Sequence, residues 1–279
     1  MSVQRRRRRV GALLATIFLV AAGLAGAPTP ARASGGSVDL LYAGSLLNLV
    51  QQRLGPAFTR ATGDAVNGYP DGSDALVSTI KGGTQRADVL LAAAPSADRR
   101  LMGPANGDWI SRYRVIGTSP LVLAYDPASR FASALRHEPW YRVVGRPGFR
   151  LGRTDPLTDP KGVLARHALA DAARRFRVPT LATLARNDAT VFPEATLVGR
   201  LQAGQLDAGF FYLVEVRSAH LTSVPLTGEK LAATFTVALV RNAPDPRAAR
   251  AFVAFLETSK ARALLAQAGI RPAARAPHA

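Results

Sequence analysis

The spacing of apolar positions along the chain changes repeatedly between that of a buried strand and that of a helix. Residues 37–42 form a short apolar run that predicts a buried strand, and after 43–45 (AGS) the apolar positions of 46–54 follow at helical spacing. Residues 69–73 (YPDGS) repeat this order of strand end, tight turn and helix start. Residues 87–92 (ADVLLA) predict a further apolar strand. Short strands alternating with helices predict parallel α/β layers.

The same alternation continues to the end of the chain. We expect strands at 120–125, 149–152, 206–212 and 234–241, and helices at about 160–176, 196–202, 246–257 and 259–267. Asp159 is expected to cap the helix at 160–176, with Pro160 at its first position. The chain shows no internal repeat and no low-complexity linker.

The first 33 residues have the three parts of an export signal. Residues 5–9 are five arginines, residues 10–26 are apolar, and 31–33 (ARA) offers a cleavage site. The apolar run is just shorter than the roughly 20 residues of a membrane-spanning helix, so a retained membrane anchor is the alternative. We expect a signal peptide over 1–33 that is cleaved on export to the periplasm, by the general or the twin-arginine route.

Composition changes this picture in two ways. The 279 residues include no cysteine, which excludes disulfides, thiolate metal centres and thiol catalysis. The net charge of +17 would suit nucleic acid, but six basic and no acidic residues lie in the first 33. The other 30 basic and 19 acidic residues leave +11. Aromatic residues make up 7%, too few for a base-stacking surface, so we expect no nucleic-acid partner.

Two serines, Ser45 and Ser73, each follow a glycine at the start of an expected helix. A helix N-terminus presents free N–H groups and the positive end of the helix dipole, so it binds anions. Gly44 and Gly72 would let a ligand approach the backbone closely. The plainer explanation is that each serine caps its helix. Because both helix starts follow strands of one parallel unit, they should share a sheet edge, and we favour an anion site there.

The segment 152–162 (GRTDPLTDPKG) contains two Asp-Pro turns. Asp159 is explained as a helix cap, whereas Asp155 has no evident capping role and stays a candidate. The four histidines are not spaced as metal ligands, and no nucleophile elbow or phosphate-binding loop occurs. We therefore expect no enzyme, no cofactor and no bound metal cation. An exported serine hydrolase with Ser45 or Ser73 as nucleophile is the weaker alternative.

Four segments together resemble the molybdate- and tungstate-binding proteins of ABC importers: 42–46 (YAGSL), 71–76 (DGSDAL), 152–162 and 197–216 (LVGRLQAGQLDAGFFYLVEV). The resemblance extends from about residue 38 to residue 272. It implies an α/β, two-lobed fold of the type II periplasmic binding proteins, with a ligand cleft between the lobes. It also implies an exported receptor that delivers a tetrahedral oxyanion to a membrane-embedded ABC permease.

The resemblance further implies which residues bind the anion. Ser45 and Ser73 match serines that donate hydroxyl and backbone N–H groups, and Tyr212 matches a tyrosine that donates from the opposite lobe. The segment around Asp155 to Asp159 and the helix start near Glu194 to Thr196 match loops that supply backbone donors. The anion is then held by neutral donors from both lobes.

One position departs from the pattern of the tungstate-type relatives. They tend to carry a glutamate before the tyrosine as an extra metal ligand, and this chain has Phe211 there. Glu215 is out of phase with Phe211 along the expected strand, so we do not expect it to substitute. The departure favours a tetrahedral anion held by hydrogen bonds alone, with Asp155 turned away or paired with Arg153 or Lys161.

These observations predict lobe 1 at 38–119 plus 225–272, lobe 2 at 120–224, and a loose tail at 273–279, in a monomeric protein. Molybdate is the first choice of ligand, with tungstate close behind. Sulfate, thiosulfate or an organic phosphonate are alternatives, because helix N-termini accept all of these anions.

Overall fold

The computed structural model describes residues 35–274. The expected signal peptide at 1–33 and the last residues of the expected tail, 275–279, lie outside this range. Within it, Ala273 donates its N–H to the carbonyl of Ile116 over 3.0 Å and accepts a bond from Arg262 over 2.7 Å. The expectation of a loose tail is therefore wrong at residue 273, which is fixed by two hydrogen bonds.

The described strands form a single sheet with the order β2-β1-β3-β8-β4-β6-β5, and β7 and β9 also pair with β4. The strands are β1 (Ser37–Ala43), β2 (Ala65–Asp71), β3 (Val89–Ala92), β4 (Ile110–Tyr125), β5 (Leu151–Gly152), β6 (Ala208–Tyr212), β7 (Thr222–Pro225), β8 (Ala232–Val240) and β9 (Arg271–Pro272).

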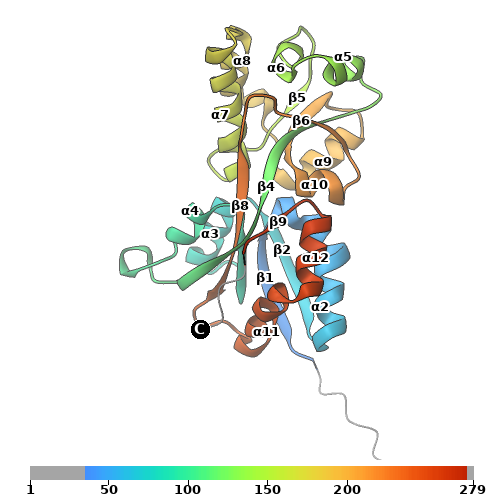
Figure 1. The fold of residues 1–279 in the computed structure, drawn as a ribbon. Coiled ribbons are helices and arrows are strands. Elements are labelled where there is room, and N and C mark those ends of the chain that lie inside the picture. The colour runs from blue at the N-terminus through green and yellow to red at the C-terminus, as the bar shows by residue number, and fades with distance from the viewer. Residues whose placement is uncertain (1–34, 275–279) are drawn as a thin grey trace, which may run out of the picture. The chain divides into compact units, whose positions relative to one another are not determined.

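The sheet is mixed, so the prediction of parallel layers holds only in part. Strand β1 pairs in parallel with β2 and β3, and β5 pairs in parallel with β6. Strand β8 lies antiparallel between β3 and β4. The reason is the path of the chain, which leaves along β4 and returns along β8 at its side, as the green and orange strands of Figure 1 show. Parallel pairing would need a separate crossover connection.

The α-helices are α1 (Leu47–Leu49), α2 (Gly55–Thr62), α3 (Ser73–Gly82), α4 (Pro95–Arg99), α5 (Ala132–His137), α6 (Trp140–Val143), α7 (Pro160–Arg175), α8 (Pro179–Arg186), α9 (Glu194–Gln202), α10 (Leu213–Ser218), α11 (Pro246–Glu257) and α12 (Ser259–Gln267). Short 3₁₀ turns occupy η1 (Gly44–Leu46), η3 (Pro104–Asn106) and η4 (Asp188–Thr190), and η2 (Val50–Leu54) is a π-helical turn. Among residues 35–274, no helix combines the length and apolar character needed to cross a membrane.

The helix expected at 46–54 continues without a break to Thr62 and contains the π-helical turn η2. Pro56 explains this irregularity. A proline inside a helix lacks an N–H and its ring clashes with the carbonyl four residues earlier. Widening the turn relieves that clash, and the N–H of Gly55 accordingly donates to the carbonyl of Val50, five residues back.

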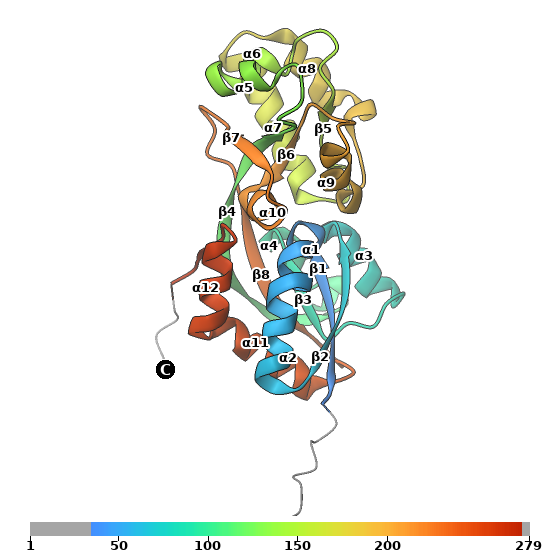
Figure 2. The same cartoon turned by 90° about the vertical axis from the view of Figure 1, so that its right-hand side faces the viewer.

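Strand β1 is buried on both faces, which explains its nearly continuous apolar sequence. Leu40 packs in one cluster with Phe58 of α2 and Phe252 of α11, whose rings meet edge to face with centroids 5.1 Å apart. Leu41 points to the other face and packs with Leu76 of α3. Figure 2 shows α2 and α11 near each other beside β1. The end of this rigid strand carries the first candidate site residues, Gly44 and Ser45.

Candidate functional site

Ser73 is the first residue of α3, as predicted, but it does not cap that helix. Its Oγ accepts a hydrogen bond of 2.9 Å from the N–H of Ala93, which follows β3. Ser73 is 1% exposed, so this bond is protected from water. The plain capping explanation is therefore wrong for Ser73, whose side chain joins two neighbouring turns. Accepting this bond leaves the hydroxyl proton to donate elsewhere.

The N-terminus of α3 receives an oxygen atom from the segment 152–162. The N–H groups of Asp74 and Ala75 donate to the carbonyl of Thr158 over 3.1 and 3.3 Å. Gly72 makes this approach possible, because a Cβ at that position would lie 2.3 Å from the same carbonyl oxygen. The space beside Gly72, which was expected to admit a ligand, is therefore taken by the backbone of Thr158.

Two predicted site residues carry buried hydroxyl groups without a partner. Ser45 lies in the turn η1 and is 3% exposed, and Tyr212 ends β6 and is fully buried. Neither the Oγ of Ser45 nor the hydroxyl of Tyr212 has a hydrogen-bond partner among the described residues. Burial, followed by the charges of nearby Asp159, Glu194 and Glu215, raises the pKa of Tyr212 well above its usual value. Unpartnered buried hydroxyls are rare and call for an explanation.

Lys161, the second residue of α7, is completely buried. Its Nζ lies 2.6 Å from Oε1 of Glu215 and 3.2 Å from Oε1 of Glu194. It also lies 5.9 Å from the centre of the Tyr212 ring. Burial by itself lowers the pKa of a lysine, but Glu215, Glu194 and Asp159 outweigh it, and the pKa of Lys161 is raised. The ammonium group therefore stays charged.

Asp159 holds the start of α7 in place, as predicted from the sequence. Its Oδ1 accepts a bond of 2.9 Å from the N–H of Lys161, and Pro160 is the first helical residue. Asp159 is 3% exposed. Its burial raises the pKa of its carboxyl group, against the lowering effect of Lys161.

Glu215 connects Lys161 to the start of α10. One of its oxygens pairs with Lys161, and Oε2 accepts a bond of 2.8 Å from the N–H of Tyr212. The strand-phase argument that excluded Glu215 is wrong, because β6 ends at Tyr212 and a helix begins at Leu213. Helical geometry brings a residue three positions after Tyr212 back to its N–H group.

Glu194 begins α9 with a side chain that is 4% exposed. Its carboxylate is pressed against Gly44, where a Cβ would lie only 2.6 Å from Oε2. Lys161 lies at ion-pair distance, yet neither oxygen of Glu194 has a partner with hydrogen-bond geometry in the described part of the chain. Burial, and next the charge of Asp159, raises the pKa of Glu194 well above its usual value.

We call Asp159, Lys161, Glu194, Tyr212 and Glu215 the buried cluster. From the sequence we expected neutral donors around Tyr212, and the structure instead places three carboxyl groups and one ammonium group there. Sequence reasoning missed Lys161, Glu194 and Glu215 as side chains of this region. Their positions at the first turns of helices were the available signal. No group of metal-binding side chains is found within residues 35–274.

Among the described residues, the side chains of Asp155 and Thr196 form no hydrogen bond or ion pair with the buried cluster, although the carbonyl of Asp155 accepts a bond of 2.9 Å from the N–H of Asp159. Asp155 is half-buried and its Oδ1 accepts from the N–H of Leu157 over 2.9 Å, so it closes its own turn. Of the two alternatives expected for Asp155, turning away or pairing with Arg153 or Lys161, the ion pair is not found among the described residues. Thr196 is exposed, and its hydroxyl donates to the carbonyl of Pro193 over 3.0 Å.

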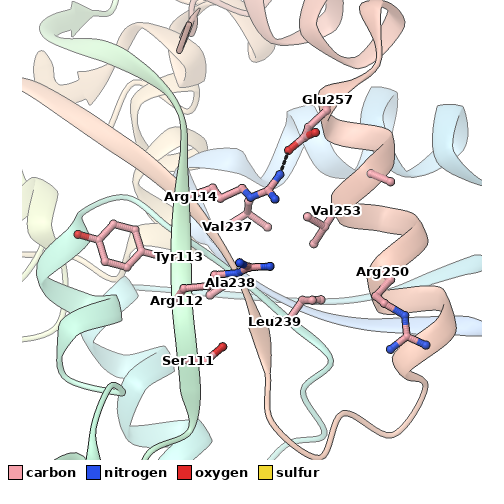
Figure 3. A pocket seen from close by; sticks show the side chains of 11 residues that line it. Ser111, Arg112, Tyr113, Arg114, Val237, Ala238, Leu239, Arg250, Val253 and Glu257 are labelled. Atoms are coloured by element: carbon pink, nitrogen blue, oxygen red, sulfur yellow. Dashed lines mark hydrogen bonds and ion pairs between the residues drawn. The ribbon is translucent and has the colours of Figure 1, made fainter. Parts of the chain in front are cut away.

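A separate hollow of about 590 Å³ lies between the first half of β4, the end of β8 and α11. Figure 3 shows Arg114 of β4 directed towards Glu257 of α11, with which it forms an ion pair, and Arg250 extending from the same helix. Both partners of the pair are more than half exposed. None of the lining residues belongs to the buried cluster.

Known proteins resemble this chain in both sequence and fold. A Haloferax volcanii protein, named as a candidate ABC transporter molybdenum-binding protein, is 31% identical over 178 residues, 63% of this chain and 55% of that one. The chain thus spans about half the length of this relative. The periplasmic molybdate-binding protein of Azotobacter vinelandii is 18% identical with a TM-score of 0.65, over 84% of this chain and 98% of that one.

The sulfate-binding protein SubI of Mycobacterium tuberculosis H37Rv gives a TM-score of 0.67 at 19% identity, over 85% of this chain and 87% of that one. Together these similarities confirm the predicted fold class, α/β of the type II periplasmic binding proteins. The model of the bacterial extracellular solute-binding proteins matches residues 39–271, almost the whole described range. This chain belongs to the bacterial extracellular solute-binding protein family.

Proposed function

We propose that this protein is an exported receptor that captures a tetrahedral oxyanion, molybdate or tungstate, and delivers it to an ABC permease. The observation that supports this most is the pair of buried hydroxyls, on Ser45 and Tyr212, that have no hydrogen-bond partner in the described chain. Each unmade bond costs about 1–3 kcal/mol, so a ligand that accepts both bonds would recover this energy.

The chemistry of the neighbouring groups suits an anion with several acceptor oxygens. A dianion that loses its water needs many donors, and hydrogen bonds to a charged group are about twice as strong as neutral ones. Ser45 and Tyr212 supply two hydroxyls, and Lys161 supplies a buried ammonium group beside Tyr212. Ser73 adds a hydroxyl proton at the start of α3.

The choice among oxyanions rests on similarity. The relative in Haloferax volcanii and the neighbour from Azotobacter vinelandii carry molybdenum and molybdate in their names, which favours molybdate, with tungstate next. The sulfate-binding neighbour keeps sulfate as the second candidate. We propose the lobe boundaries of the sequence analysis unchanged, with β4 and β8 as the strands that pass from one lobe to the other.

Calorimetric titration of the mature protein with molybdate, tungstate, sulfate and thiosulfate tests this proposal. We expect molybdate to bind most tightly, or as tightly as tungstate. Tyr212→Phe should weaken molybdate binding about ten- to a hundredfold, because the variant removes one bond to a charged group. Tyr113→Phe, in the hollow of Figure 3, is the matched control and should bind as the unaltered chain does. The proposal fails if none of the four anions binds.

A further inference from the structure

The hollow beside α11 contains more basic than acidic side chains. Arg112 and Arg114 of β4 line it together with Arg250 of α11. Its acid is Glu257 of α11, which pairs with Arg114. Within residues 35–274, neither Arg112 nor Arg250 forms an ion pair or a side-chain hydrogen bond. The hollow of about 590 Å³ therefore holds two arginines that no acid of the described chain neutralises.

The backbone directs these side chains to the same space. Arg112 and Arg114 are two residues apart on β4, and side chains at this spacing leave a strand on the same face. Figure 3 shows both extending from β4 towards α11, with Tyr113 on the opposite side of the strand. Arg250 and Val253 are three residues apart, so they lie on one side of α11. A strand and a helix thus form the two walls of the hollow.

Apolar side chains line the same hollow. They are Val237 and Leu239 of β8 and Val253 of α11. Val237 is buried, but Leu239 is 37% exposed, one of three large apolar side chains that are exposed within residues 35–274. A single exposed apolar side chain is normal, but this one lies in a concave site beside unpaired charges. The hollow therefore offers cationic and apolar surface to one molecule.

Two structural explanations account for only part of this arrangement. Within the described chain, residues 111–115 of β4 have β8 as their sole partner strand, and charged side chains such as Arg112 and Arg114 keep an open strand edge from joining another sheet. This reason does not extend to Arg250, which lies on a helix, and an exposed Leu239 works against it. The basic excess of the whole chain explains arginines in general, but not two without an acid beside an exposed leucine.

A guanidinium group presents a planar fork of N–H donors that matches a carboxylate or a phosphate group. Hollows of roughly 300–1,000 Å³ with apolar walls and a few polar groups are typical of small-molecule sites. We propose that this hollow is a second binding site, for an organic anion whose carboxylate or phosphate groups pair with Arg112 and Arg250. The apolar part of the ligand lies on Leu239 and Val253. The site shares no residue with the buried cluster and does not depend on the proposed function.

Glu257 allows a test in the opposite direction. Its carboxylate pairs with Arg114 and repels an arriving anion. Glu257→Gln should therefore free that arginine and strengthen anion binding, whereas loss of an arginine should weaken it. Both partners of the pair are more than half exposed, and exposed ion pairs contribute little to stability, so the variant should fold normally. Opposite effects of neighbouring substitutions would locate the ligand in the hollow.

Calorimetric titration of the mature chain with phenyl phosphate at pH 7 and low salt tests the site, because this probe joins a phosphate group to an apolar ring. We expect a Kd of about 1 mM or lower. Inorganic phosphate, which cannot use the apolar surface, should bind about tenfold more weakly. Arg112→Ala and Arg250→Ala should each weaken phenyl phosphate binding about three- to tenfold, and Glu257→Gln should strengthen it about two- to fivefold. Arg142→Ala, at an exposed arginine of α6, is the matched control and should change nothing.

The second site is refuted if phenyl phosphate does not bind at up to about 10 mM, if neither arginine variant changes its binding, or if inorganic phosphate binds equally tightly. Binding that Tyr212→Phe removes would also refute it, because the probe would then lie at the buried hydroxyls. Molybdate binding should be unchanged in Arg112→Ala, so the second site and the proposed function can each fail alone. Co-sedimentation with phosphatidylglycerol vesicles, lost in Arg112→Ala, would support the site with a lipid phosphate as ligand, whereas phenyl phosphate binding without it supports a soluble organic anion.

Discussion

Replacing Lys161 by methionine tests the charge balance of the buried cluster most directly. The substitution keeps a long side chain of similar reach but removes the cation that pairs with Glu215 and Glu194. Burial raises the pKa values of Asp159, Glu194 and Glu215, and the charge of Lys161 is the largest effect that lowers them. Without it, each carboxyl group must either bind a proton or remain as an uncompensated buried charge.

The size of the effect follows from the burial of the lysine. Removing one partner of a buried ion pair costs about 3–5 kcal/mol. For a chain of this length, 1 kcal/mol corresponds to a shift in Tm of about 2–4 °C, so Lys161→Met should lower Tm by roughly 6–20 °C at pH 7. The exposed Lys260→Met should shift it by no more than about 2 °C.

The sign of the pH dependence is determined by the direction of the pKa shifts. A carboxyl group whose pKa is raised in the folded protein binds more protons in the folded than in the unfolded chain. The free energy of unfolding is therefore highest below the pKa of the unfolded chain and decreases as pH rises towards the pKa of the folded protein. Lys161→Met raises the three pKa values further. The loss of stability of Lys161→Met relative to the unaltered chain should therefore be smallest near pH 4 and grow towards pH 8.

Urea denaturation followed by circular dichroism at pH 4, 6 and 8 measures this deficit, with the double variant Lys161→Met/Glu215→Gln beside it. The double variant keeps the acceptor for the Tyr212 N–H but removes one uncompensated charge, so it should recover about half of the loss at pH 8. A loss below about 1 kcal/mol, or a deficit that is constant with pH, would show that the cluster is not held by its charges.

Three further predictions concern other parts of the chain. Burial raises the pKa of Asp98 to about 6, so the unaltered chain should lose about 2–3 kcal/mol of stability as pH rises from 4 through 6. Urea denaturation of Asp98→Asn should not show this loss. The prediction is contradicted if the stability of the variant and that of the unaltered chain change with pH in the same way. Ser73→Ala should lower the free energy of unfolding, measured by urea titration, by about 1 kcal/mol, because it removes the bond from the N–H of Ala93. Ser45→Ala should weaken molybdate binding, measured by calorimetry, about tenfold with little change in stability. Mass spectrometry of the exported protein should find an N-terminus near Ser34, and an intact Met1 would refute the signal peptide.

The sequence alone predicted the elements whose causes are local. Asp159 and Pro160 mark the start of α7 because an N-cap and a first-turn proline act on groups within two residues of themselves. The apolar run of β1 and the helix starts at Gly72-Ser73 could be recognised for the same reason. The type II fold could also be recognised, through the order of four short segments.

What only the tertiary structure decided is the set of partners around each buried group. Lys161 meets Glu215 across 54 positions of sequence, and Ser73 meets Ala93 across 20. Glu215 was placed on a strand, and only packing shows that β6 ends at Tyr212 and that α10 brings the Glu215 carboxylate back to the N–H of Tyr212. The cost of burying a charge depends on what else is buried beside it, and that information is spread over segments that meet only in the folded chain.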